Sequence, residues 1–103
     1  MEASYETHRL DWRGLEIEVR YCPEWMPFYR EIYGYGLAHI EVESLTRDPL
    51  PMTETGYRSH FERPDNIEAA GGPAEYVLAW LEQEAASGQW KRAEEGRRQM
   101  SLF

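Results

Sequence analysis

The sequence lacks the features that identify secreted and membrane proteins. It contains one cysteine, Cys22, so no disulfide can form within the chain, and we interpret this thiol as a small buried hydrophobe of a reduced protein. No apolar run is long enough to cross a membrane, and the first residues lack the hydrophobic region of a signal peptide. These absences predict a cytoplasmic protein without a membrane partner.

Basic residues are also scarce, and they are unevenly distributed. The formal net charge is −8; residues 1–90 carry seven arginines against seventeen acidic residues, whereas residues 91–103 carry four basic and two acidic residues. Because an acidic body repels phosphates, direct nucleic-acid binding by residues 1–90 is disfavoured. The acidity favours solubility or, as an alternative, mimicry of nucleic acid.

Common enzyme signatures are missing as well. The sequence has no glycine-rich phosphate loop with a lysine, no G-x-S-x-G elbow, no Cys/His pairing suited to a nucleophile and no H-E-x-x-H motif. The sequence therefore predicts a non-enzymatic protein with no cofactor and no metal.

What the chain does contain is strand periodicity. Residues 15–21 alternate apolar and charged side chains and follow a turn at Gly14, which predicts a hairpin with residues 8–10. Residues 38–44 alternate in the same way, as expected for a strand with one buried face. Residues 53–61 are a candidate fourth strand, at the edge of the sheet.

The clearest helix is predicted to start at Pro73, a residue suited to the first helical position, and to end near Gly88. Its apolar stripe consists of Tyr76, Val77, Trp80, Leu81 and Ala85. The predicted fold class is α+β, with an antiparallel three- or four-stranded meander covered by one main C-terminal helix. Residues 1–90 then form a single domain, and the charged residues 91–103 are expected to be extended and mobile.

Residues 24–36 are rich in aromatic side chains and are interrupted by Pro27. We predict a short helix or irregular turn that packs on the sheet as a hydrophobic flap, because aromatic residues in small domains mostly fill cores. The alternative is an exposed aromatic binding platform.

A polar set on the strands could carry chemistry. Two histidines and carboxylates suit Zn²⁺ or another divalent ion, and a His with a Glu suits acid–base catalysis. The alternative is a solvated strand face, since charged faces are mostly solvated. The set comprises His39, Glu41, Glu43, Glu54, Arg58 and His60.

The last five residues carry the most specific signal. They read Gln99-Met100-Ser101-Leu102-Phe103, which resembles the peptide by which bacterial replication and repair proteins dock on the ring-shaped DNA sliding clamp, with consensus Gln-Leu-Ser/Asp-Leu-Phe. Methionine replaces the first leucine, a substitution of similar volume. The resemblance implies that Gln99 hydrogen-bonds in a polar subsite and that Leu102 and Phe103 fill an apolar pocket.

The pattern WRGLEIEVRY, AHIEVES, PLPMTETGYRSHF and GGPAEYVLAWL is similar to small proteins of bacterial plasmids and integrated elements, a resemblance that implies no particular activity. Our first hypothesis is a non-enzymatic accessory or regulatory protein of bacterial or mobile-element DNA metabolism that docks on the sliding clamp. The second is an acidic inhibitor or nucleic-acid mimic directed against a host DNA-acting or defence enzyme. The third is a small metal-dependent enzyme that uses His39 and His60. The sequence leaves the oligomeric state open.

Overall fold

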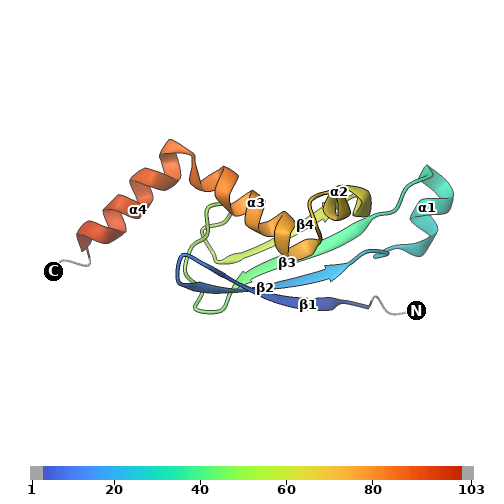
Figure 1. Cartoon of the computed structure of the whole chain (residues 1–103), viewed down its shortest axis with the longest axis horizontal. Helices are drawn as coiled ribbons and strands as arrows, with labels where there is room; N and C mark the ends of the chain where they lie inside the picture. Colours follow the sequence, from blue (N-terminus) through green and yellow to red (C-terminus); the bar gives the residue numbers. More distant parts are fainter. Residues whose placement is uncertain (1–3, 101–103) are drawn as a thin grey trace.

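The chain folds into a four-stranded antiparallel sheet with helices on one side (Figure 1), which confirms the predicted α+β class. The structure, a computed structural model, describes residues 4–100 and the side chains of residues 4–96. The strands lie in the order β1-β2-β3-β4, a simple meander. The elements are β1 (Glu6–Trp12), β2 (Leu15–Cys22), α1 (Pro27–Tyr33), β3 (Ala38–Ser44), β4 (Tyr57–Glu62), α2 (Pro64–Ala69), α3 (Pro73–Ala85) and α4 (Gly88–Met100).

The predicted hairpin joins β1 to β2 through a two-residue turn. Arg13 and Gly14 both adopt positive φ, at 51° and 85°, as the turn type that matches the twist of hairpin strands requires. The Asp11 side chain accepts a hydrogen bond from the Gly14 backbone N–H at 3.1 Å. The turn therefore fixes the register in which Trp12 pairs with Leu15.

The core lies between the sheet and the helices α2 and α3. Along β3, every second side chain is buried, beginning at Ala38, so the predicted alternation is confirmed. The helix α3 buries Val77, Leu81 and Ala85 on the sheet, while Tyr76 and Trp80 pack at the border of the core and remain partly exposed. The predicted stripe is therefore correct, with its centre at Leu81 rather than at Trp80.

The segment around α1 does not pack as predicted. None of the residues of α1 is buried, and Phe28 and Ile32 are each 69% exposed. The three tyrosines of this segment contact each other instead; the rings of Tyr29 and Tyr33 lie 4.4 Å apart. Gly34, with φ 80°, ends the helix. The flap prediction is wrong for α1.

The prediction of an extended chain after Trp90 is also wrong, because α4 continues to Met100. Gly88 does not cap α3; it is the first residue of α4. Ser87 caps the N-terminus of α4, since its Oγ accepts a hydrogen bond from the Trp90 backbone N–H at 3.1 Å. Residues 91–95 are all strong helix formers, although four of the five are charged. Within residues 4–100, the helices are all too short or too polar to span a membrane.

Candidate functional site

Aromatic and charged contacts attach the base of α4 to the body. Trp90 is 8% exposed, and its ring lies 6.1 Å from that of Trp12 at the end of β1. The guanidinium of Arg13 in the hairpin turn lies 3.7 Å from Glu94 of α4 and 3.4 Å from Glu82 of α3. Beyond this base, α4 extends past the end of the sheet (Figure 1).

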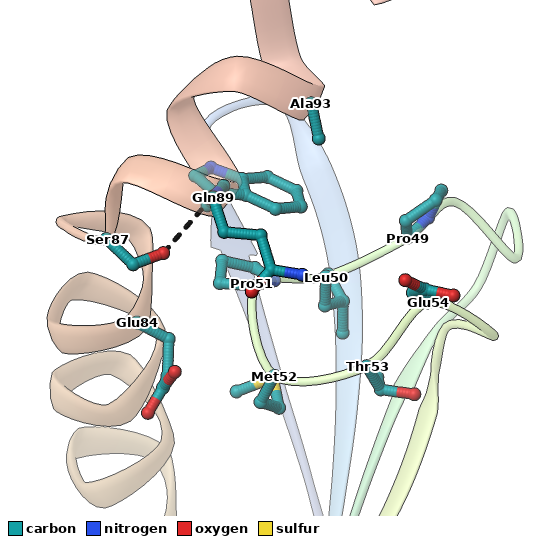
Figure 2. Close-up of a pocket in the computed structure, with 11 residues that line it drawn as sticks. Pro49, Leu50, Pro51, Met52, Thr53, Glu54, Glu84, Ser87, Gln89 and Ala93 are labelled. Atoms are coloured by element: carbon teal, nitrogen blue, oxygen red, sulfur yellow. Dashed lines mark hydrogen bonds between the residues drawn. The ribbon is translucent and has the colours of Figure 1, made fainter.

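A pocket of about 580 Å³ lies beside Trp90, between the β3–β4 connection and the junction of α3 and α4. In Figure 2, Leu50, Pro51 and Met52 of the connection face Ser87 and Gln89 across the pocket. Glu54, one of the predicted polar residues, lies on the rim of this pocket and not beside the histidines. The pocket leaves the packing around the base of α4 incomplete.

The clamp-like motif begins at the far end of α4. Gln99 and Met100 belong to the last turn of the helix, and Ser101, Leu102 and Phe103 lie outside the described residues. Of the side chains between Lys91 and Gly96, all but that of Glu94 are exposed. The body therefore makes little contact with α4 beyond its base, and the helix carries the start of the motif away from the sheet.

The strand register separates the predicted polar set. Ile40 of β3 pairs with His60 of β4, and His39 pairs with Phe61. Residues directly opposite each other share a face, so His60 lies on the helix-covered face, whereas His39 lies on the open face. The two histidines do not form the shared site that the third hypothesis requires, because a shift of one residue moves a side chain to the other face of the sheet.

On the open face, His39 connects three parts of the chain. The Tyr5 hydroxyl lies 2.6 Å from Nδ1, and Ser59 Oγ lies 2.6 Å from Nε2. A neutral imidazole accepts at one nitrogen and donates at the other, so both contacts can be satisfied at once. Burial, followed by the charge of Glu41, raises the pKa of Tyr5. Nδ1 thus faces a neutral hydroxyl rather than the carboxylate of a hydrolase triad, and Trp25 and Phe61 cover the ring.

Several carboxylates of the open face are neutralised by arginines. Arg20 contacts Glu41 at 2.8 Å, and Arg47 contacts Glu43 at 3.3 Å. Glu18 lies 3.7 Å from Arg9. Because each of the three carboxylates is paired, they do not form a continuous row of negative charge. A nucleic-acid mimic needs such a row, so this face gives little support to the second hypothesis.

On the helix-covered side, His60 and Arg58 line a cleft between β4 and α3. The Tyr76 hydroxyl donates to Glu62 at 2.9 Å and lies 3.3 Å from His60 Nε2. Burial lowers the pKa of His60, and burial together with the contact to Glu62 raises the pKa of Tyr76 to about 12. Burial alone would raise the pKa of Glu62, but hydrogen bonds from Asn66, the next backbone N–H and Tyr76 outweigh it and lower that pKa.

The residues that sequence reasoning missed are Tyr5, Tyr76 and Glu62. Tyr76 and Trp80 are spaced by four positions on one helix, a signal for a shared face, but their proximity to His60 depends on how α3 crosses β4. Among the described residues, no three His, Cys, Asp or Glu side chains are placed to hold a metal ion.

These features define a small α+β domain that buries one face of its sheet and carries a charged helix away from it. The chain belongs to the family of the KlcB third domain, whose model matches residues 5–90. Membership of this family indicates a plasmid-associated accessory protein. No curated protein and no solved structure matches the chain. The family match ends at Trp90, so the remainder of α4 and residues 101–103 lie beyond it.

Proposed function

We propose that this protein is a non-enzymatic accessory protein of plasmid or mobile-element DNA metabolism that docks on the bacterial DNA sliding clamp through residues 99–103. The observation that supports it best is the position of the first two residues of the motif. A 13-residue helix, about 20 Å long at 1.5 Å per residue, carries Gln99 and Met100 away from the body. A ring-shaped partner can therefore approach the motif without meeting the sheet.

Docking of an extended peptide requires the last turn of α4 to unwind. Gly96 stands at the start of that turn, and glycine weakens a helix interior by about 1 kcal/mol relative to alanine. Glu95, the residue before Gly96, is exposed, and the ion pair of Glu94 with Arg13 lies before the turn that must unwind. The resulting ordering of a short peptide on the clamp costs entropy, and we expect a Kd in the micromolar range.

The charge of α4 favours a partner of opposite sign. Residues 91–103 have a net charge of +2, whereas residues 1–90 have a net charge of −10. Lys91 and Arg92 are exposed, so they accelerate encounter with an acidic surface, while the body discourages approach from other directions. This arrangement predicts association that slows as salt is added.

Calorimetry with purified bacterial clamp tests the proposal. The intact chain should bind, and both a chain truncated before Gln99 and the double variant Leu102→Ala/Phe103→Ala should not. Leu78→Ala, which removes a partly exposed leucine of α3, is the matched control and should bind as the intact chain does. If the intact chain gives no heat of binding, or the truncated chain binds equally well, the proposal fails.

A further inference from the structure

The cleft between β4 and α3 has the chemistry of a cation site, and it lies on the body, apart from residues 99–103. Its volume is about 580 Å³. Three of the side chains that line it are rings: His60 from β4, and Tyr76 and Trp80 from α3. The ring centroids of His60 and Trp80 lie 4.8 Å apart, and those of Tyr76 and Trp80 lie 6.3 Å apart. The faces of Trp and Tyr rings attract cations.

Carboxylates complete the lining. Glu84 follows Trp80 by one helical turn, so both side chains border the cleft from the same face of α3. Within the part of the chain whose side chains are described, Glu84 has no ion pair. Glu62 lines the cleft from β4 and is held in position by Tyr76 and Asn66, each at 2.9 Å.

The charges of the cleft favour a cationic ligand over an anionic one. Two carboxylates, Glu62 and Glu84, outnumber the one guanidinium of Arg58. Burial lowers the pKa of His60, which favours the neutral ring over the charged one. Since the protein as a whole carries a net charge of −8, an anion would be repelled both locally and at long range.

Arg58 itself indicates which cation fits. Its guanidinium carbon lies 5.8 Å from the centre of the Trp80 ring, and its side chain is exposed. A guanidinium is planar and weakly hydrated, so it stacks on an aromatic face and pairs with a carboxylate at the same time. We propose that the cleft binds a guanidinium group from outside the chain, which takes the place of Arg58 at Trp80 and forms an ion pair with Glu84.

The test uses acetyl-arginine amide as the probe, and binding is followed by NMR through the indole N–H signals. The signal of Trp80 should shift with an affinity in the millimolar range, as a ligand of this size allows. Trp80→Leu and Glu84→Gln should each weaken binding by about two-fold to thirty-fold, the range that corresponds to one cation–π contact or charge pair. Arg58→Gln should strengthen binding, because it removes both a competitor and a like charge.

Three controls distinguish specific binding in the cleft from general electrostatic attraction to the acidic protein. Glu75→Gln changes the net charge as Glu84→Gln does, but Glu75 is an exposed residue of the first turn of α3, so this variant should bind as the intact chain does. Acetyl-lysine amide should bind more weakly than the arginine probe. Binding should also weaken in acid, when His60, which lines the cleft together with Arg58, Glu62, Tyr76 and Glu84, becomes charged.

A tetra-arginine peptide then identifies the source of the guanidinium. Tighter binding of the peptide, with the same dependence on Trp80 and Glu84, supports a basic segment of a partner protein; equal binding supports a small free ligand. The proposal is overturned by any of three results. These are no shift of the Trp80 signal, an equal loss of affinity in Glu75→Gln and Glu84→Gln, or weaker binding in Arg58→Gln. The Glu84 and Arg58 variants decide the matter even if Trp80→Leu is unstable.

Discussion

The helices α3 and α4 follow each other in the chain and contain 13 residues each, but they have opposite roles. α3 buries three side chains on the sheet along its length, whereas among the described side chains of α4 only Trp90, near its start, is buried. The difference shows that helix length says little about contribution to the fold. A regular apolar stripe makes α3 part of the core, and the absence of one makes α4 a projection from it.

The largest effect is expected at the centre of the α3 stripe. Leu81 is fully buried, so Leu81→Ala should lower the free energy of unfolding by about 2–5 kcal/mol, the range for large-to-small changes in a core. Denaturant unfolding measures this. Leu78→Ala, on the same helix but 36% exposed, should cost clearly less; similar costs at both positions would mean that α3 packs differently.

Trp90 tests how firmly α4 is attached. Because Trp90 lines two pockets, Trp90→Ala should cost about 2 kcal/mol, below the 3–5 kcal/mol that removal of an enclosed large aromatic costs. The helical circular dichroism signal should also fall, because α4 is no longer attached to the body. Gln89→Ala, at the neighbouring exposed position, should change neither quantity, and an equal loss there would contradict the anchoring role of Trp90.

Acid should act on the side of the sheet covered by α3. The pKa of His60 is lowered in the folded state, so the unfolded chain binds more protons and stability falls as the pH drops below 6.5. The pKa of Glu62 is also lowered, so its contribution is lost as the pH falls further, below 4.5. Unfolding measured at several pH values should show both losses.

Two variants test whether the pH dependence of stability comes from the side of the sheet covered by α3 and not from the end of α4. His60→Gln should flatten the pH dependence between pH 7 and pH 5, because the titrating group is gone. Truncation before Gln99 should leave the pH dependence as it is in the intact chain. A flat profile in the intact chain would show that His60 is not desolvated as its contacts to Tyr76 and Trp80 imply.

The smallest effect on stability is expected at the end of α4. Removal of residues 99–103 should change the free energy of unfolding by less than about 0.5 kcal/mol, as for surface changes, and should abolish the proposed clamp binding. Thermal unfolding and calorimetry on the same samples measure the two quantities. A chain that unfolds several degrees earlier after truncation would show that these residues stabilise the body.

The predictable part of the fold is the part set by local pattern. The period of two in β2 and β3 and the helical stripe of α3 follow from which side chains must leave water, and each is confirmed. The exposure of α1 was not predictable, because aromatic content indicates apolar surface but not whether the sheet covers it. The helix α4 was missed because it has no apolar period beyond Trp90, although Ser87 offered a capping signal.

The candidate sites depended on information that the pattern does not contain. Along β4, Tyr57 and Phe61 alternate with Arg58, His60 and Glu62. Alternation alone would turn the two aromatic rings toward the core, whereas the register places them on the open face. The long β3–β4 connection leaves the register open, and the register decides that His39 meets Ser59 while His60 meets Tyr76. The clamp-like motif, in contrast, is a sequence feature and needed no fold to be recognised.

The positions of α1 and α4 have a consequence for assembly. The two helices lie at opposite ends of the molecule's long axis (Figure 1), which measures 56 Å against 24 and 20 Å for the other two. A small partner bound at the tip of α4 would therefore leave the exposed aromatic side chains of α1 uncovered. The domain is elongated, and its two ends are far enough apart for two small partners to contact it at the same time.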